Sequence, residues 1–230
     1  MAQKSTKDPR LISYDTLRKA IGWLGILLPA AMIAGNYALG NCHVLQDSNS
    51  HYYYTVTGNL FTGILCAVAL FLIVYKGFNL LDNIVTSLAG CFAFGIAMFP
   101  TNENSADSCA IIHLPLNELR NDVHYWFAAL FFITLAFISL FLFTKSKGPT
   151  TKLKQTRNKI YRICGTTILV TVALLAIYSL SDDESFQQFD KHKPIFWLEW
   201  VALTAFGISW LVKGKLILED EQNKSKAHGR

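Results

Sequence analysis

Residues 56–75 read VTGNLFTGILCAVALFLIVY and contain no charged side chain. An α-helix rises about 1.5 Å per residue, so a helix of about 20 residues crosses a hydrocarbon layer of about 30 Å. The apolar residues of this stretch surround such a helix completely, whereas a helix on the surface of a soluble protein carries them on one face. The stretch therefore predicts a membrane-spanning helix.

Similar stretches, almost free of charge, occur along the rest of the chain. They cover residues 21–39, 84–99, 123–143, 163–180 and 195–212. The 230 residues are 52% hydrophobic and 16% charged, against about 25% charged for a soluble domain. The sequence thus predicts an all-α, polytopic membrane protein. Its six-helix transmembrane bundle occupies residues 20–212, between an N-terminal segment at 1–19 and a tail at 213–230.

The basic residues predict how the six helices are oriented. All Lys and Arg residues except Arg120, Lys191 and Lys193 fall before the first stretch, after the second, between the fourth and fifth, or after the sixth. These segments share one side of a six-span protein, and positive residues near helix ends favour the cytoplasm. Both termini are therefore expected in the cytoplasm. The net charge of +5 suits a surface of anionic lipid and needs no nucleic-acid partner.

The opposite, outer side gathers polar and ionisable residues. Glu199 lies about one turn into the sixth stretch, and a charged group inside a membrane helix usually faces the bundle interior or water. We expect His124 as its partner. A pocket opening outward, for a small or lipid-like molecule, would be lined by Asn36, Asn59, His124 and Glu199, with His51 and Tyr54 at its rim. The competing interpretation of Tyr52, Tyr53 and Tyr54 is an aromatic belt at the membrane surface.

Two of the five cysteines, Cys42 and Cys109, fall in outer loops. If the outer side is oxidising, they are the pair available for a disulfide, and we expect one to link the two loops. Cys66, Cys91 and Cys164 fall within or at the edge of helices as small packing residues. Their spacing is not that of a zinc site, and no cofactor is predicted.

Small residues and one proline predict how the helices pack. Rows at a spacing of four occur at Ala30, Ala34 and Ala38, at Ala89, Ala93 and Ala97, and at Gly63 and Ala67. Such rows let helix backbones approach closely, within one bundle or between the subunits of a homo-oligomer. Pro29 removes a backbone hydrogen bond in the first helix and should bend it.

Several segments together resemble a widespread group of bacterial six-helix integral membrane proteins for which no activity is assigned. They are RKAIGWLGILLP (18–29), HYYYTVTGNLFTGILCAVALFLIVYKG (51–77), DNI (82–84), AMFPT (97–101) and FWLEWVALTAFGISWLVKG (196–214). The resemblance covers most of the chain and implies a multi-pass protein of a bacterial inner membrane.

A second resemblance is to the intramembrane hydrolases related to alkaline ceramidases and adiponectin receptors, which use seven helices, zinc and an H-x-x-x-H pair. This chain has six predicted helices and no H-x-x-x-H. The enzyme alternative is nevertheless a metal-dependent lipid hydrolase with zinc as its cofactor. Its ligands and base would come from His51, His113, His124, Asp122 and Glu199. A third alternative is a scaffold, or a subunit of a larger membrane complex.

Overall fold

The computed structural model describes residues 9–103, 109–145, 151–180 and 190–218, and within these ranges it contains helices and no strand. The long helices are α1 (Pro9–Gly40), α2 (Gly58–Val74), α3 (Leu80–Met98), α4 (Glu118–Phe137), α5 (Lys152–Leu180) and α7 (Pro194–Lys213). Three short helical turns join them: η1 (Ser50–Tyr54), the π-helical η2 (Ile138–Leu142) that continues α4, and η3 (Asp190–His192).

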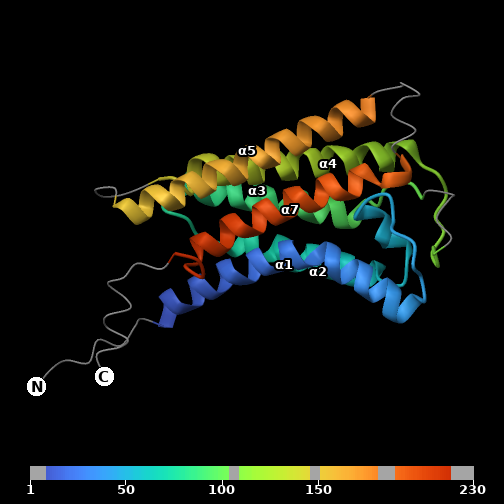
Figure 1. Ribbon diagram of the computed structural model, residues 1–230, viewed down its shortest axis with the longest axis horizontal. Coiled ribbons are helices and arrows are strands. Elements are labelled where there is room, and N and C mark those ends of the chain that lie inside the picture. Colours follow the sequence, from blue (N-terminus) through green and yellow to red (C-terminus); the bar gives the residue numbers. More distant parts are fainter. Residues whose placement is uncertain (1–8, 104–108, 146–150, 181–189, 219–230) are drawn as a thin grey trace, which may run out of the picture.

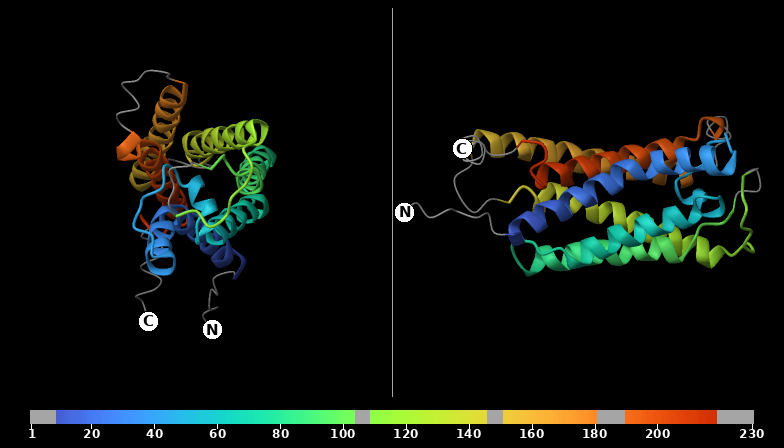
Figure 2. Two further views of the ribbon diagram at one scale, coloured as in Figure 1. Left: turned by 90° about the vertical axis from the view of Figure 1, so that its right-hand side faces the viewer. Right: turned by 90° about the horizontal axis from the view of Figure 1, so that it is seen from below.

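The six long helices run along one direction and alternate in sense, so the start of α1 and the end of α7 lie at the same end of the bundle (Figure 1). Each helix packs against the next in the chain, and α7 packs against α1, which closes the six into a ring (Figure 2). We call the end that holds residues 14–19, 75–79 and 213–218 the basic end. The opposite end, which holds residues 41–57 and 109–117, is the plug end.

Five helices are long and apolar enough to cross a membrane: α1 over Tyr14–Gly40, α3, α4 with η2 over Glu118–Leu142, α5 and α7. The sixth, α2, is apolar but has 17 residues. The prediction of an all-α membrane bundle is confirmed, with five helices that meet the length and composition of a membrane span.

The helices α3 and α4 begin before the apolar stretches that predict them. The side chain of Asn79 accepts the backbone N–H of Asp82 at 2.9 Å, and that of Asn117 accepts the N–H of Arg120 at 3.0 Å. Such caps satisfy backbone donors that the first turn of a helix leaves free. Each apolar stretch therefore starts within its helix, after a polar first turn.

Glycines set the crossing of the first and last helices. A Cβ on Gly22 would lie 2.8 Å from the carbonyl oxygen of Gly207, and a Cβ on Gly207 would lie 2.5 Å from the carbonyl oxygen of Gly22. The two backbones can approach this closely because neither residue has a side chain. α1 stays helical across Pro29 and bends along its length (Figure 1).

The predicted rows of small residues have mixed outcomes. Ala89, Ala93 and Ala97 of α3 are buried, as expected of packing residues. The other two rows do not pack within the bundle, because Ala34 and Ala38 are exposed and a Cβ on Gly63 would meet nothing within 4 Å. Contact between subunits stays a prediction for these two rows. On α1 the close helix contact is made instead by the face that carries Gly22.

Replacing Gly207 with alanine should destabilise the bundle. The new Cβ would overlap a backbone atom of α1, and overpacking of this kind costs about 1–3 kcal/mol. Gly63→Ala is the matched control, since its Cβ enters open space and should be neutral or stabilise by up to about 1 kcal/mol. Thermal unfolding of both variants in detergent measures the difference. Equal transition temperatures would contradict the close α1–α7 contact.

Candidate functional site

The connection between α1 and α2 turns into the plug end of the bundle rather than crossing over its surface. We call residues 46–57 the plug. Gln46, Ser48, Asn49 and Tyr52 are buried, and the Tyr52 ring lies 6.1 Å from that of Phe196 in α7. Buried polar groups need hydrogen-bond partners, so the contacts of these residues show what holds the plug in place.

Glu199 of α7 holds the plug from one side. One of its carboxylate oxygens, Oε2, accepts the backbone N–H of Asn49 at 2.7 Å and the side-chain amide of Asn49 at 3.1 Å. The N–H of Phe196 donates to the backbone oxygen of Asp47 at 3.0 Å, and Lys193 pairs with the Asp47 carboxylate. The start of α7 therefore binds two residues of the plug, Asp47 and Asn49.

His124 of α4 holds the plug from the other side, and its hydrogen bonds fix which nitrogen carries the proton. Nδ1 lies 2.6 Å from the backbone oxygen of Phe99. A carbonyl oxygen can only accept, so Nδ1 is the protonated nitrogen of the neutral ring and Nε2 is an acceptor. Nε2 lies 2.9 Å from Oγ of Ser50, and the hydroxyl of Ser50 is thus the donor.

His51 bonds within the plug itself. Its Nδ1 lies 2.8 Å from Oγ of Ser48, and its backbone N–H donates to the same oxygen at 3.3 Å. Burial lowers the pKa of His51 below its usual value; the carboxylate of Asp47 raises this pKa in part, and the ammonium of Lys193 lowers it further. Neutral His51 accepts the Ser48 hydroxyl, which stabilises the turn that presents Asn49 and Ser50.

Tyr54 connects the plug to the loop between α3 and α4, and a disulfide connects the segment just before the plug to the same loop. The buried Tyr54 hydroxyl donates to the backbone oxygen of Thr101, and its own backbone oxygen accepts the N–H groups of Ile111 and Ile112 at 2.8 and 3.2 Å. Burial raises the pKa of Tyr54, so the phenol stays protonated. Cys42 and Cys109 form a disulfide with Cα atoms 5.9 Å apart.

The two asparagines of the expected pocket lie in different surroundings. Asn36 is buried near the end of α1 and accepts the Thr57 hydroxyl at 3.2 Å, while Thr57 in turn lies 2.9 Å from the Thr55 hydroxyl. Asn59 is exposed in the first turn of α2. Asn36 therefore contributes to the base of the plug, and Asn59 does not.

The expected pair of His124 and Glu199 is wrong. His124 binds Ser50 and Glu199 binds Asn49. These two neighbouring plug residues lie where we expected His124 and Glu199 to contact each other directly. The two groups are still brought to one site. Together they present an imidazole acceptor and a carboxylate acceptor to the plug.

The residues of the metal alternative are not gathered. His113 is exposed and pairs with Glu103 at 2.8 Å, Asp122 is exposed, and His51 and His124 bond to serines. Within the described ranges no three His, Cys, Asp or Glu side chains lie close enough to hold a metal ion. A zinc site built from these residues would need a different arrangement of the plug end.

Sequence reasoning missed the residues that bind His124 and Glu199. The run SNS at 48–50 directly precedes His51 and the three tyrosines at 52–54. Its short polar side chains are typical of a turn. Sequence reasoning also missed a cavity at the basic end, between α1, the α2–α3 link and the residues after α7.

Comparison with known proteins gives no match: no family model, no curated protein and no solved structure is similar to this chain. The function must therefore be inferred from the geometry.

The stability of the protein should fall as the pH drops below about 6.5. The unfolded chain takes up a proton at His51 near that pH, whereas the folded protein, with its lowered pKa, does not, so the free energy of unfolding decreases. His51→Asn supplies an acceptor for Ser48 that does not titrate. Unfolding in detergent between pH 8 and pH 5 should then show a shallower decline for the variant, and parallel profiles would contradict the role of His51.

Proposed function

We propose that this chain is a six-span protein of a bacterial inner membrane with both termini in the cytoplasm, and that its plug end binds or moves a small or lipid-like molecule. The resemblance of its sequence to bacterial six-helix membrane proteins supports the location. The charge distribution supports the orientation, because the described basic residues other than Arg120, Lys191 and Lys193 gather at the basic end.

The sixth span would be α2. Its 17 residues give a length of about 25 Å at 1.5 Å per residue, and helices of about 17–25 residues span membranes. The alternating direction of the six helices supports the same count, since the described ends of α1 and α7 share the basic end (Figure 1).

The single observation that carries the binding role is the pair of acceptors under the plug. Glu199 and Nε2 of His124 both accept hydrogen bonds, and donors from Asn49 and Ser50 satisfy them. A ligand that replaces the plug must therefore supply donors itself, as hydroxyl or ammonium groups do. The plug acts as a gate that leaves these acceptors bonded when no ligand is present.

The remaining alternatives rest on no comparable contact. A metal-dependent hydrolase needs several ligand side chains that point at one metal ion. A scaffold needs a surface for its partner that differs in chemistry from the helix faces in contact with lipid. The binding role uses groups that already meet at one site.

Accessibility labelling tests the orientation. In a variant without Cys66, Cys91 and Cys164, a single new cysteine at Leu116 should react with a membrane-impermeant maleimide from outside intact cells. A cysteine at Thr151 should react only after the membrane is opened. Reaction of both from the same side would contradict the six-span scheme.

Lipid headgroups test the acceptor site. Phosphatidylethanolamine carries an ammonium donor, whereas phosphatidylcholine carries the same phosphate without a donor. We expect the purified protein to bind the ethanolamine lipid about tenfold more tightly, the equivalent of about 1.4 kcal/mol for a hydrogen bond to a charged group. Native mass spectrometry measures both affinities.

Glu199→Gln should remove this preference, because it replaces the carboxylate with a weaker, neutral acceptor. Asp122→Asn is the matched control: it removes an exposed carboxylate of α4 at the same end and should leave the preference intact. Equal binding of the two lipids by the unsubstituted protein would contradict the proposal.

A further inference from the structure

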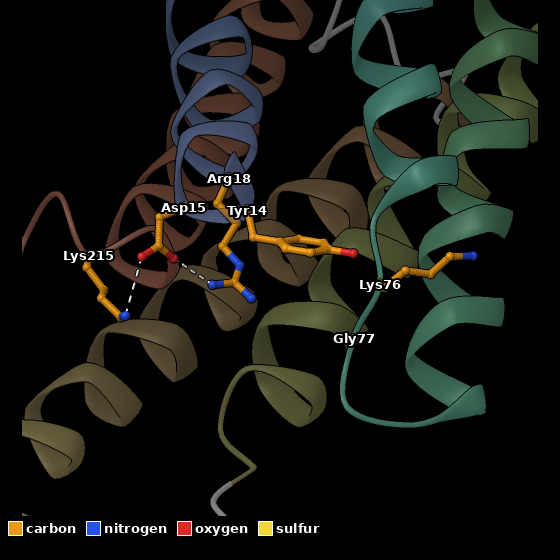
Figure 3. Close-up of a pocket in the computed structure, with 6 residues that line it drawn as sticks. All are labelled: Tyr14, Asp15, Arg18, Lys76, Gly77 and Lys215. Carbon is orange, nitrogen blue, oxygen red and sulfur yellow. Dashed lines mark hydrogen bonds and ion pairs between the residues drawn. The ribbon is translucent and has the colours of Figure 1, made fainter. Parts of the chain in front are cut away.

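A cavity of about 310 Å³ opens at the basic end, far from the plug. It is lined by Tyr14, Asp15 and Arg18 of α1, by Lys76 and Gly77 of the α2–α3 link, and by Lys215 just after α7 (Figure 3). Three of these side chains are cationic and one is acidic. The cavity therefore carries an excess of positive charge in its own wall.

Arg18 is held in position rather than free to move. One terminal nitrogen, Nη1, donates to Asp15 at 2.8 Å, and the other, Nη2, lies 3.4 Å from the Tyr75 hydroxyl, with the guanidinium 5.5 Å from the centre of the Tyr75 ring. The third nitrogen of the guanidinium, Nε, is buried, and its N–H has no partner within the described residues. A planar guanidinium with a remaining donor suits a phosphate or carboxylate oxygen.

The carboxylate of Asp15 does not neutralise the cavity. It binds Arg18 through one oxygen and Lys215 through the other, at 3.3 Å, so that two cations share one negative charge. Figure 3 shows Asp15 between these two side chains, with Tyr14 reaching from Arg18 toward the link that carries Lys76. Lys76 is exposed and has no ion pair in the described part of the chain.

Within the described ranges, Asp82 is the other acidic residue of this end, and it has partners of its own. Asp82, buried at the start of α3, pairs with Lys145 at 2.6 Å and accepts the N–H of Phe78 at 2.9 Å. A Cβ on Gly77 would lie 2.3 Å from that of Asp82, so the glycine lets the link pass close to α3 and form the cavity wall. Asp82 thus fixes the wall, and among the described residues its carboxylate contacts Lys145 and Phe78 rather than the cations of the cavity.

Apolar side chains flank the cationic lining on two sides. Phe78 and Leu81 follow Gly77, and Leu216 and Ile217 follow Lys215; all four are exposed, each by at least 41%. A charged cavity next to exposed apolar side chains matches a molecule with an anionic head and a hydrocarbon tail.

From these contacts we infer that the cavity binds a phosphate group, carried by the headgroup of an anionic lipid. Arg18, Lys76 and Lys215 receive the phosphate oxygens, and the flanking apolar residues contact the acyl chains. This site differs in chemistry from the plug end, which offers acceptors, and it does not depend on the function proposed there.

Phosphatidic acid is the direct probe, because its headgroup is a bare phosphate, and phosphatidylcholine is the neutral comparison. The full-length protein in neutral detergent should bind phosphatidic acid more tightly than phosphatidylcholine by native mass spectrometry. Lys76→Gln and Lys215→Gln should each weaken that binding about tenfold, and Arg18→Gln by about 10- to 100-fold, as expected for the loss of charge-assisted hydrogen bonds.

Lys159→Gln is the matched control, because Lys159 is an exposed cation near the start of α5 outside the cavity, and it should leave binding unchanged. Lys76 is exposed and has no ion pair among the described residues, so its variant tests the site even if Arg18→Gln unfolds the protein. Glu199→Gln should not affect phosphatidic acid, which separates this site from the plug end. Unchanged binding in both lysine variants would overturn the inference, as would equal affinity for the two lipids.

Inorganic phosphate distinguishes a lipid from a soluble source of the same group. Displacement of phosphatidic acid by inorganic phosphate at millimolar concentration, lost in Lys76→Gln, supports a phosphate site that soluble anions also reach. Resistance to displacement, together with the loss of lipid binding in the lysine variants, supports a site for lipid alone.

Discussion

The contact between Gly22 and Gly207 is the constraint on which the rest of the bundle depends. It joins the first and last helices at backbone distance, and so closes a ring in which each helix otherwise touches its neighbour in sequence. Both sites described above are built across this closure. At one end α7 brings Glu199 to the plug that follows α1, and at the other it brings Lys215 to Asp15 of α1.

The two ends of the bundle carry opposite chemistry. The plug end offers acceptors, Glu199 and His124, which donors of the plug satisfy. The basic end offers donors, Arg18 and Lys215 among them, with one carboxylate shared between them. Charge is separated along the helix axis because the charged residues lie in the loops and toward the ends of the helices. The middle turns of the helices carry no Asp, Glu, His, Lys or Arg.

The membrane-crossing parts of the helices could be predicted from sequence because apolar runs are local. Their starts could not: capping asparagines extend α3 and α4 by a few residues, and α1 and α5 begin at Pro9 and Lys152, well before their apolar stretches. The hydrogen-bond partners of the site residues could not be predicted from the sequence. Periodicity does not show which face of α1 meets α7: the spacing of small residues points to the row through Ala34, whereas Gly22 makes the contact. Nor does it show that the short SNS turn enters the bundle between α4 and α7. The cavity at the basic end combines three segments far apart in sequence, although Tyr14 and Arg18 lie one helical turn apart.

The position of the disulfide in the chain has a consequence for biosynthesis. Cys42 and Cys109 both precede α4, whereas Glu199 and Gly207 belong to the last helix. A chain made from its N-terminus can therefore cross-link its α1–α2 and α3–α4 connections before α7 leaves the ribosome. The late helix then meets a tethered loop and an already inserted α1, so that ring closure and capture of Asn49 become the final step of assembly.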